Sequence, residues 1–176
     1  FCQAGVIYKP YREKNTSVIM QTVEKGLKLS GVNEVTFTSL SSGDYSHILP
    51  LTSYFNEKYK SKKISVALPS LKVESFDTQI LDRLSEVRKS GLTFAIESGS
   101  QEGQFSLNKR VDLEKIYQIL DVAVTKGWRL VKFYFMIGLP DEGNDVENIT
   151  KFVDAVLERY KKLKIKHGYT SYTRIF

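Results

Sequence analysis

The chain has 176 residues, 41% hydrophobic and 26% charged, which is typical of one soluble domain able to bury a sizeable core. A single cysteine excludes a disulfide framework, no apolar run reaches the ~20 residues that cross a bilayer, and no secretory signal pattern is present. We therefore expect one cytoplasmic domain over residues 1–176, without a membrane partner, whose net charge of +6 permits RNA binding but does not require it.

Helical and extended patterns alternate along the chain. In chain order they predict a helix capped by Thr16 or Ser17 and ended by Gly31, a strand at Glu34–Thr38, a helix from about Ile48 with Pro50 in its first turn, and a strand at Ile64–Leu68. They continue with a helix capped by Asp77 and closed by Ser90-Gly91, a strand at Thr93–Ile96, a helix from Asp112 to Gly127, a strand at Leu130–Ile137, a helix from Asn144 or Asp145, and extended chain from about Ile165. This alternation predicts parallel strands joined by crossover helices, as all or part of a (β/α) barrel or as a doubly wound sheet.

Two basic stretches, residues 58–63 and 159–166, lie where we expect a helix to end and a strand to begin. Cations near a helix C-terminus stabilise the helix dipole, so a structural role accounts for both stretches. Their positions therefore give little support to an RNA partner.

The connecting loops differ in length according to their direction. Loops from a helix to the next strand are minimal, as at residues 31–33, 61–63, 90–92 and 127–129. Loops from a strand to the next helix are long and chemically rich, at residues 39–47, 69–76, 97–111 and 138–143. Because the carboxyl ends of parallel strands share one edge, we expect the functional site at that edge.

Three of the long loops carry groups that suit a small ligand. Residues 39–45 combine small side chains with Asp44, whose carboxylate can bind a ligand ammonium, although an ordinary Ser/Gly/Asp turn has the same composition. Glu97 directly follows an apolar strand, where it could bind a ribose diol, and Ser98 beside it could cap the following turn. Gly138 ends the most apolar strand, so it either permits close approach of a flat ligand or forms a plain turn.

Signatures of several other enzyme classes are missing from the sequence. His47 and His167 offer no metal-binding spacing, and there is neither a G-x-x-x-x-G-K-[ST] phosphate loop nor a G-x-S-x-G nucleophile elbow. No lysine stands out at a strand end as the Schiff base of an aldolase-type barrel. Hydrolase and aldolase functions therefore lose support.

The chain opens with Phe1-Cys2-Gln3-Ala4-Gly5, and Tyr8 follows. Alone, Cys2 could be an ordinary small apolar residue. Together with four later segments, however, the opening resembles the radical S-adenosylmethionine superfamily, whose CxxC-Q-A-G-x-x-Y segment it matches. The later segments are similar to the family's ammonium loop at 39–45, the loop after its third strand at 68–73, its E-S-G-S-Q…N-K segment at 97–109 and its F-M-I-G-L-P strand at 135–140. The most similar subgroup has a cobalamin-binding-like domain before the radical domain, and tRNA methylthiotransferases are more distantly similar.

This resemblance implies an α/β fold, a partial (β/α)6 barrel that lacks its first strand and is truncated at its last. It implies an enzyme in which a 4Fe–4S cluster reductively cleaves S-adenosylmethionine to a 5′-deoxyadenosyl radical, which abstracts hydrogen from an unidentified substrate. Cys2 becomes an iron ligand, and the other two cysteines are expected before residue 1. The implied cofactor-binding residues are Phe1, Ser42, Gly43, Asp44, Lys72, Glu97, Ile137 and Gly138, with Arg12 a further candidate for the methionine carboxylate.

The chain also departs from the family pattern. One thiolate cannot hold a cluster, so we expect these residues alone to be inactive. Because the most similar subgroup has a cobalamin-binding-like domain, cobalamin could be a further cofactor of the parent protein. The alternative is a non-catalytic (β/α) module that serves as a scaffold or binds a partner, which could be RNA. The absence of a C-x-x-x-C-x sequence before Phe1 would favour this alternative. Without a first strand, Glu34–Thr38 is an open sheet edge, so we expect self-association or coverage by the chain's own residues.

Overall fold

The computed structural model describes residues 2–69, 71–74, 76–87, 89, 91–128, 130–139, 143–167 and 174–175. Its helices are α1 (Ala4–Ile7), α2 (Thr16–Ser30), α3 (Ile48–Tyr59), α4 (Thr78–Ser85), α5 (Gln101–Ser106), α6 (Leu113–Thr125) and α7 (Asp145–His167). The strands are β1 (Glu34–Thr36), β2 (Ser65–Ala67), β3 (Leu92–Glu97), β4 (Leu130–Phe135) and β5 (Arg174–Ile175), and two single 3-10 turns are η1 (Ser42–Asp44) and η2 (Lys60–Lys62).

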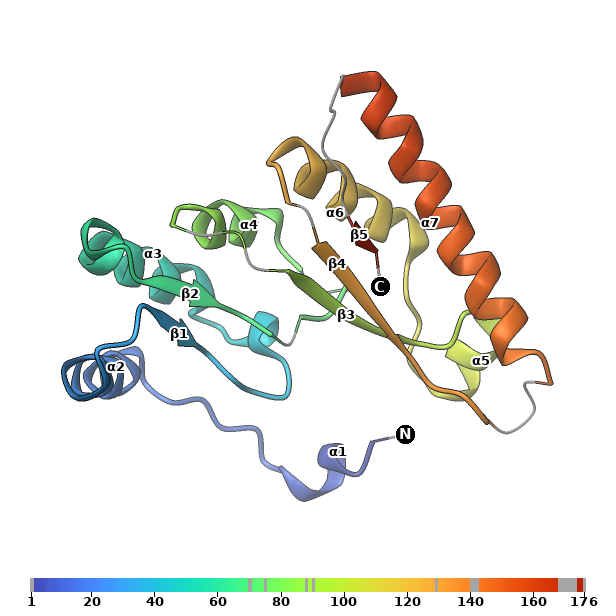
Figure 1. Cartoon of the computed structure of the whole chain (residues 1–176). Coiled ribbons are helices and arrows are strands. Elements are labelled where there is room, and N and C mark those ends of the chain that lie inside the picture. Colours follow the sequence, from blue (N-terminus) through green and yellow to red (C-terminus); the bar gives the residue numbers. More distant parts are fainter. Residues whose placement is uncertain are drawn as a thin grey trace.

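The strand pairs of the described residues are parallel and follow chain order. β1 pairs with β2, and β3 pairs with β4, which pairs with β5. A single parallel bridge between Leu71 and Phe94 joins the chain after β2 to β3, so the two sheets follow one another. The structure therefore confirms the predicted α/β class and the order of a partial (β/α) barrel. Figure 1 shows α3, α4, α6 and α7 along one side of the strands, with α1 apart from them.

Most helix ends have the local cause that the sequence indicated. The side chains of Asp77 and Asp112 cap α4 and α6, each accepting a hydrogen bond from a backbone N–H two residues later. Gly31 ends α2 with a φ of 65°, a left-handed conformation that glycine adopts without strain. The predicted cap of α2 is wrong, because Asn15 caps it and accepts hydrogen bonds from both the N–H and the hydroxyl of Ser17.

Four other differences concern short elements or the ends of elements. α1 and α5 were not predicted, since four and six residues are too few to show a helical period. α7 continues to His167, so extended chain from about Ile165 is wrong, whereas the basic stretch 159–166 lies in the last turns of α7, near a helix end as predicted. The predicted ends of β1, β2 and β4 extend one or two residues beyond the observed strands. Ser90 lies outside the described residues, and α4 ends earlier, at Ser85.

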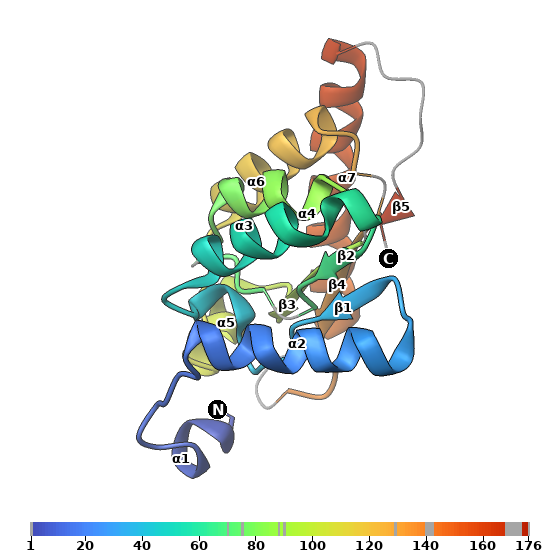
Figure 2. The ribbon, with the colours of Figure 1, turned by 90° about the vertical axis from the view of Figure 1, so that its left-hand side faces the viewer.

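The core lies between the strands and the helices beside them. Leu92, Phe94 and Ile96 of β3 are buried in alternation, and Phe94 contacts Phe76 edge-on. The other β3 positions, ending at Glu97, are half-buried. Figure 2 shows α2 alongside β1, with α1 set apart. This packing fixes the strands, and therefore the loops that leave their carboxyl ends.

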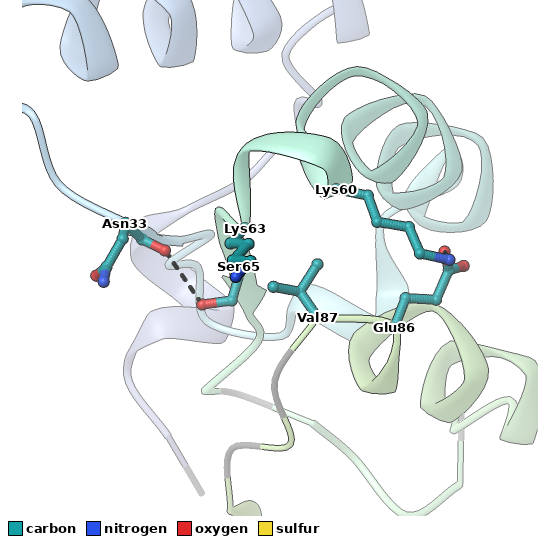
Figure 3. Close-up of a pocket in the computed structure, with 6 residues that line it drawn as sticks. All are labelled: Asn33, Lys60, Lys63, Ser65, Glu86 and Val87. Carbon is teal, nitrogen blue, oxygen red and sulfur yellow. Dashed lines mark hydrogen bonds and ion pairs between the residues drawn. The ribbon is translucent and has the colours of Figure 1, made fainter.

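A cavity of about 450 Å³ opens at the opposite end of the strands (Figure 3). Its lining comes from the loops that enter β1 and β2 and from the end of α4: Asn33, Lys60, Lys63, Ser65, Glu86 and Val87. Lys60 is paired with Glu86 at 3.1 Å, and the Ser65 hydroxyl donates to the Asn33 carbonyl. Active sites of parallel (β/α) folds lie at the other end, so this cavity is not the candidate site.

Candidate functional site

The long loops after β1 to β4 leave the same end of the parallel strands, as predicted. The loop after β1 contains η1, the loop after β2 contains Lys72, and the loop after β3 contains α5 and Lys109. The bridge from Leu71 to Phe94 brings the second loop against β3. Side chains from separate parts of the sequence therefore meet at this edge.

Asp44 and Lys72 form an ion pair between the first two loops. The Lys72 Nζ lies 2.9 Å from the Asp44 Oδ2, and the lysine side chain is about half exposed. Gly43 precedes Asp44 within η1 and is half-buried. The sequence predicted that Asp44 and Lys72 bind opposite charges of one ligand, and the structure places these two opposite charges side by side.

Ser42 has an internal role in the same loop. It is buried, and its hydroxyl donates a hydrogen bond to the Phe37 carbonyl at 3.0 Å and lies 3.2 Å from the Ser39 hydroxyl. These contacts close the turn that carries Asp44. Contact between Ser42 and a ligand stays a prediction, whereas the structure shows that Ser42 stabilises the loop through these hydrogen bonds.

Glu97 occupies an unusual backbone position at the end of β3. Its φ is 71°, and the β3–β4 register shifts between Ala95 and Glu97. The N–H of Met136 donates to the Glu97 carbonyl at 2.7 Å. Left-handed backbone is costly for a side chain with a Cβ, and such positions cluster at functional sites.

The Glu97 carboxylate is held by Lys109, whose Nζ donates to Oε1 at 2.8 Å. Ser98 does not cap the next helix; Ser100 caps α5 through the Gly103 N–H, and Ser98 accepts from the Ser100 N–H. Ser98 therefore caps the turn that follows it, as predicted, and Ser100 caps α5.

Gly138 follows β4 in a left-handed conformation, with a φ of 82°. Its N–H donates to the carboxylate of Asp145, the first residue of α7. Ile137 beside it has an exposed side chain, and a Cβ added at Gly138 would meet nothing within 4 Å. The turn thus presents open space at its surface, as close approach of a ligand requires.

The segment with Cys2 lies at the start of the chain. Phe1 lies outside the described residues, Cys2 is exposed, and Arg12 is exposed. The next residue, Glu13, ties the segment to the start of α3, because its Oε1 accepts from the Ser46 N–H at 2.8 Å, the Ser46 hydroxyl and the Tyr11 hydroxyl. The sequence did not predict this tie, because no local pattern links residues so far apart.

An iron–sulfur cluster does not fit the donors of this chain alone. In the described part of the chain, no three Cys, His, Asp or Glu side chains form a group that could hold a metal ion. The sequence supplies one thiolate, whereas a 4Fe–4S cluster takes several. The polar pairs at the strand ends, by contrast, suit a ligand with charged and hydroxyl groups.

Comparison with known proteins identifies the family. The model of the Radical SAM superfamily matches residues 1–153. The chain belongs to the radical SAM superfamily.

No helix in the described ranges is both long and apolar enough to span a bilayer.

Two proteins similar to this radical SAM chain are longer than the part that it matches. It is 28% identical over 166 residues to an uncharacterized protein of Methanocaldococcus jannaschii, aligning 94% of the chain with 36% of that protein. Coproporphyrinogen III oxidase (HemN) from Escherichia coli, a radical SAM enzyme, matches with a TM-score of 0.59 and 15% identity over 82% of this chain and 35% of that chain. The chain therefore spans about a third of each relative, and the HemN match confirms the fold class.

Proposed function

We propose that this chain is the S-adenosylmethionine-binding core of a radical SAM enzyme. The observation that carries the proposal is Glu97, a paired carboxylate held in left-handed backbone at a strand end of a radical SAM domain. The chemistry implied by the family is reductive cleavage of S-adenosylmethionine, for which a cluster supplies one electron, and this chain binds and orients the ligand. Cys2 would contribute one of the iron ligands, and the others would come from outside these 176 residues.

The amino-acid end of the ligand suits Asp44 and Lys72. The ligand ammonium would bind the Asp44 carboxylate, and the ligand carboxylate would bind Lys72. Each residue would then replace its present ion-pair partner with a ligand group of the same charge as that partner. Lys72 is about half exposed and flexible, so it can move aside at little cost.

The nucleoside end suits Glu97 and the Gly138 turn. Glu97 already has a cation beside it, which favours a neutral hydroxyl donor over a second ammonium. The backbone of Ile137 and Gly138 would lie against adenine, where the missing Cβ of Gly138 leaves space. These preferences give the ligand one orientation along the strand ends.

Separate variants of the whole protein test the two halves of the proposal, after anaerobic reconstitution with iron and sulfide. Cys2→Ala is expected to lower the iron and sulfide content, because it removes a thiolate. Glu97→Ala is expected to keep the cluster but weaken S-adenosylmethionine binding about tenfold or more, through loss of a charge-assisted hydrogen bond.

Calorimetric titration and iron analysis give the two readouts, and Glu147→Ala, an exposed carboxylate on α7, is the control. Wild-type protein that binds neither cluster nor S-adenosylmethionine would favour a non-catalytic binding or scaffold module. Unchanged affinity in Glu97→Ala would remove that residue from the site.

A further inference from the structure

Lys109 and Glu97 form the more enclosed of the two ion pairs at the strand ends. Their side chains are 23% and 17% exposed, against 52% and 31% for Lys72 and Asp44. The Lys109 Nζ donates to the Glu97 Oε1 at 2.8 Å. Partial removal from water strengthens such a charge-assisted hydrogen bond, so this pair fixes its partners more firmly.

A buried amide connects the two segments that carry this pair. Gln104 is 7% exposed; its Nε2 donates to the Ser98 carbonyl and its Oε1 accepts from the Val111 N–H, both at 3.0 Å. Its own carbonyl accepts from the Lys109 N–H at 2.8 Å. Gln104 therefore holds Ser98, the residue after Glu97, and the backbone N–H groups of Lys109 and Val111.

The backbone next to both charges is also specified. Asn108 has a φ of 51°, which reverses the chain so that Lys109 faces back toward β3. Glu97 has left-handed backbone and its carbonyl accepts from Met136. Two unusual backbone positions, a buried amide and an ion pair thus converge on one carboxylate.

We propose that Lys109 is a positioning residue for Glu97, and that Gln104 holds Lys109 in place for this task. This inference rests on the proposed function. Lys109 occupies Oε1 and orients the carboxylate, so Oε2 accepts a hydrogen bond from a ribose hydroxyl. Because Lys109 balances the charge, the pair selects a neutral diol over a cationic group.

The test measures binding to the whole reconstituted protein by calorimetry, with two ligands that are not cleaved. One is S-adenosylhomocysteine and the other is its analogue lacking both ribose hydroxyls. Lys109→Met is expected to weaken binding of S-adenosylhomocysteine roughly tenfold, and to leave affinity for the dideoxy analogue at the wild-type value. Lys109→Arg, which keeps a donor and the charge, is expected to restore most of the loss.

Two further variants complete the comparison. Lys151→Met removes an exposed lysine that is paired with Glu147 on α7, and it is expected to bind both ligands like the wild type. The double variant Glu97→Gln with Lys109→Met is expected to bind S-adenosylhomocysteine no more weakly than Glu97→Gln alone. Both substitutions disrupt the same ion pair between Lys109 and Glu97, so their effects do not add.

The outcomes separate this inference from the proposed function. Wild-type affinity in Lys109→Met, or an equal loss for both ligands, overturns the positioning role even when Glu97→Gln weakens binding. A wild-type protein that does not bind S-adenosylhomocysteine overturns the proposed function and this inference with it. A loss confined to the diol-bearing ligand and rescued by Lys109→Arg supports both.

Discussion

Lys72 Nζ lies 2.9 Å from Asp44 Oδ2, joining the loop after β2 to the loop after β1. An amino acid carries one ammonium and one carboxylate, the same two charges that this pair brings together. The pair can therefore exchange partners with the amino-acid end of a ligand without leaving either charge uncompensated.

Asp44→Asn is the first prediction that follows from this pair. In the whole protein it is expected to weaken S-adenosylmethionine binding about tenfold or more, because a charge-assisted hydrogen bond becomes a neutral one. Binding of methylthioadenosine, which has no amino-acid end, is expected to stay unchanged. Glu24→Gln, which removes the partner of Lys58 in another ion pair between separate elements, is the control. An equal loss for both ligands would assign Asp44 to loop stability alone.

The tie between Glu13 and Ser46 predicts a pH dependence. The Ser46 N–H lowers the pKa of Glu13 below its ordinary value of 4.5, burial opposes the shift, and the Tyr11 and Ser46 hydroxyls add to it. Because the folded pKa is lowered, the stability from this tie is fully present above pH 4.5 and is lost as the pH falls through the folded pKa.

A nuclear magnetic resonance titration of the Ser46 amide checks this sign. The amide shift is expected to move at a pH below 4.5, together with faster amide exchange in residues 8–15. In Glu13→Gln, which keeps an oxygen acceptor but cannot ionise, the pH-dependent shift is expected to disappear. A Ser46 titration at or above the ordinary glutamate pKa would contradict the tie.

Much of the fold could be predicted because its causes are local. Asp77 and Asp112 precede apolar periodic segments and cap the expected helices. Asn15 was missed because Thr16 and Ser17, which follow it, also suit a cap, and only the three-dimensional contacts show that Asn15 accepts from Ser17. The continuation of α7 was missed because its last turns are rich in lysine rather than apolar residues.

The sequence predicted which of these residues lie at the strand ends, but not which pairs they form. Strand-end location identified Asp44, Glu97 and Gly138, since the position follows from the alternation of strands and helices. The partners Lys109 and Asp145, by contrast, depend on how separate loops fold back. A local sequence pattern does not fix such long-range contacts, so these pairings required the structure.

The open edge of β1 carries the prediction of self-association. The Asn33 carbonyl and the Phe37 N–H bond to β2, so by alternation the backbone of Glu34 and Thr36 faces the other edge. Within the described ranges, β2 is the strand that pairs with β1. A strand edge that has no strand partner invites another chain, so we expect residues 1–176 to associate at high concentration.

Thr36→Pro is expected to reduce this association, because it removes an outward N–H without removing a bond to β2. Light scattering over a concentration series measures the effect, and Thr36→Val, which keeps the N–H, is expected to associate like the wild type. A wild-type chain that stays monomeric at high concentration would disprove the prediction.

Gly99 lies where the loop after β3 meets α7. A Cβ added there would lie 2.5 Å from the backbone carbon and oxygen of Asn148 and 2.6 Å from the backbone nitrogen of Ile149. Backbone atoms of a helix cannot move aside as the end of a flexible side chain can. The close approach also brings the Glu97 loop against the helix whose first residue holds Gly138.

Gly99→Ala is therefore expected to destabilise the chain by about 1–3 kcal/mol, the usual cost of overpacking. Gly26→Ala is the matched control, because Gly26 lies inside α2 with nothing within 4 Å of an added Cβ. That change is expected to stabilise the chain by about 0.5–1 kcal/mol, since alanine favours a helix more than glycine does. Urea unfolding of both variants measures the difference. Equal stability of the two variants would show that α7 and the Glu97 loop are not in the close contact seen at Gly99.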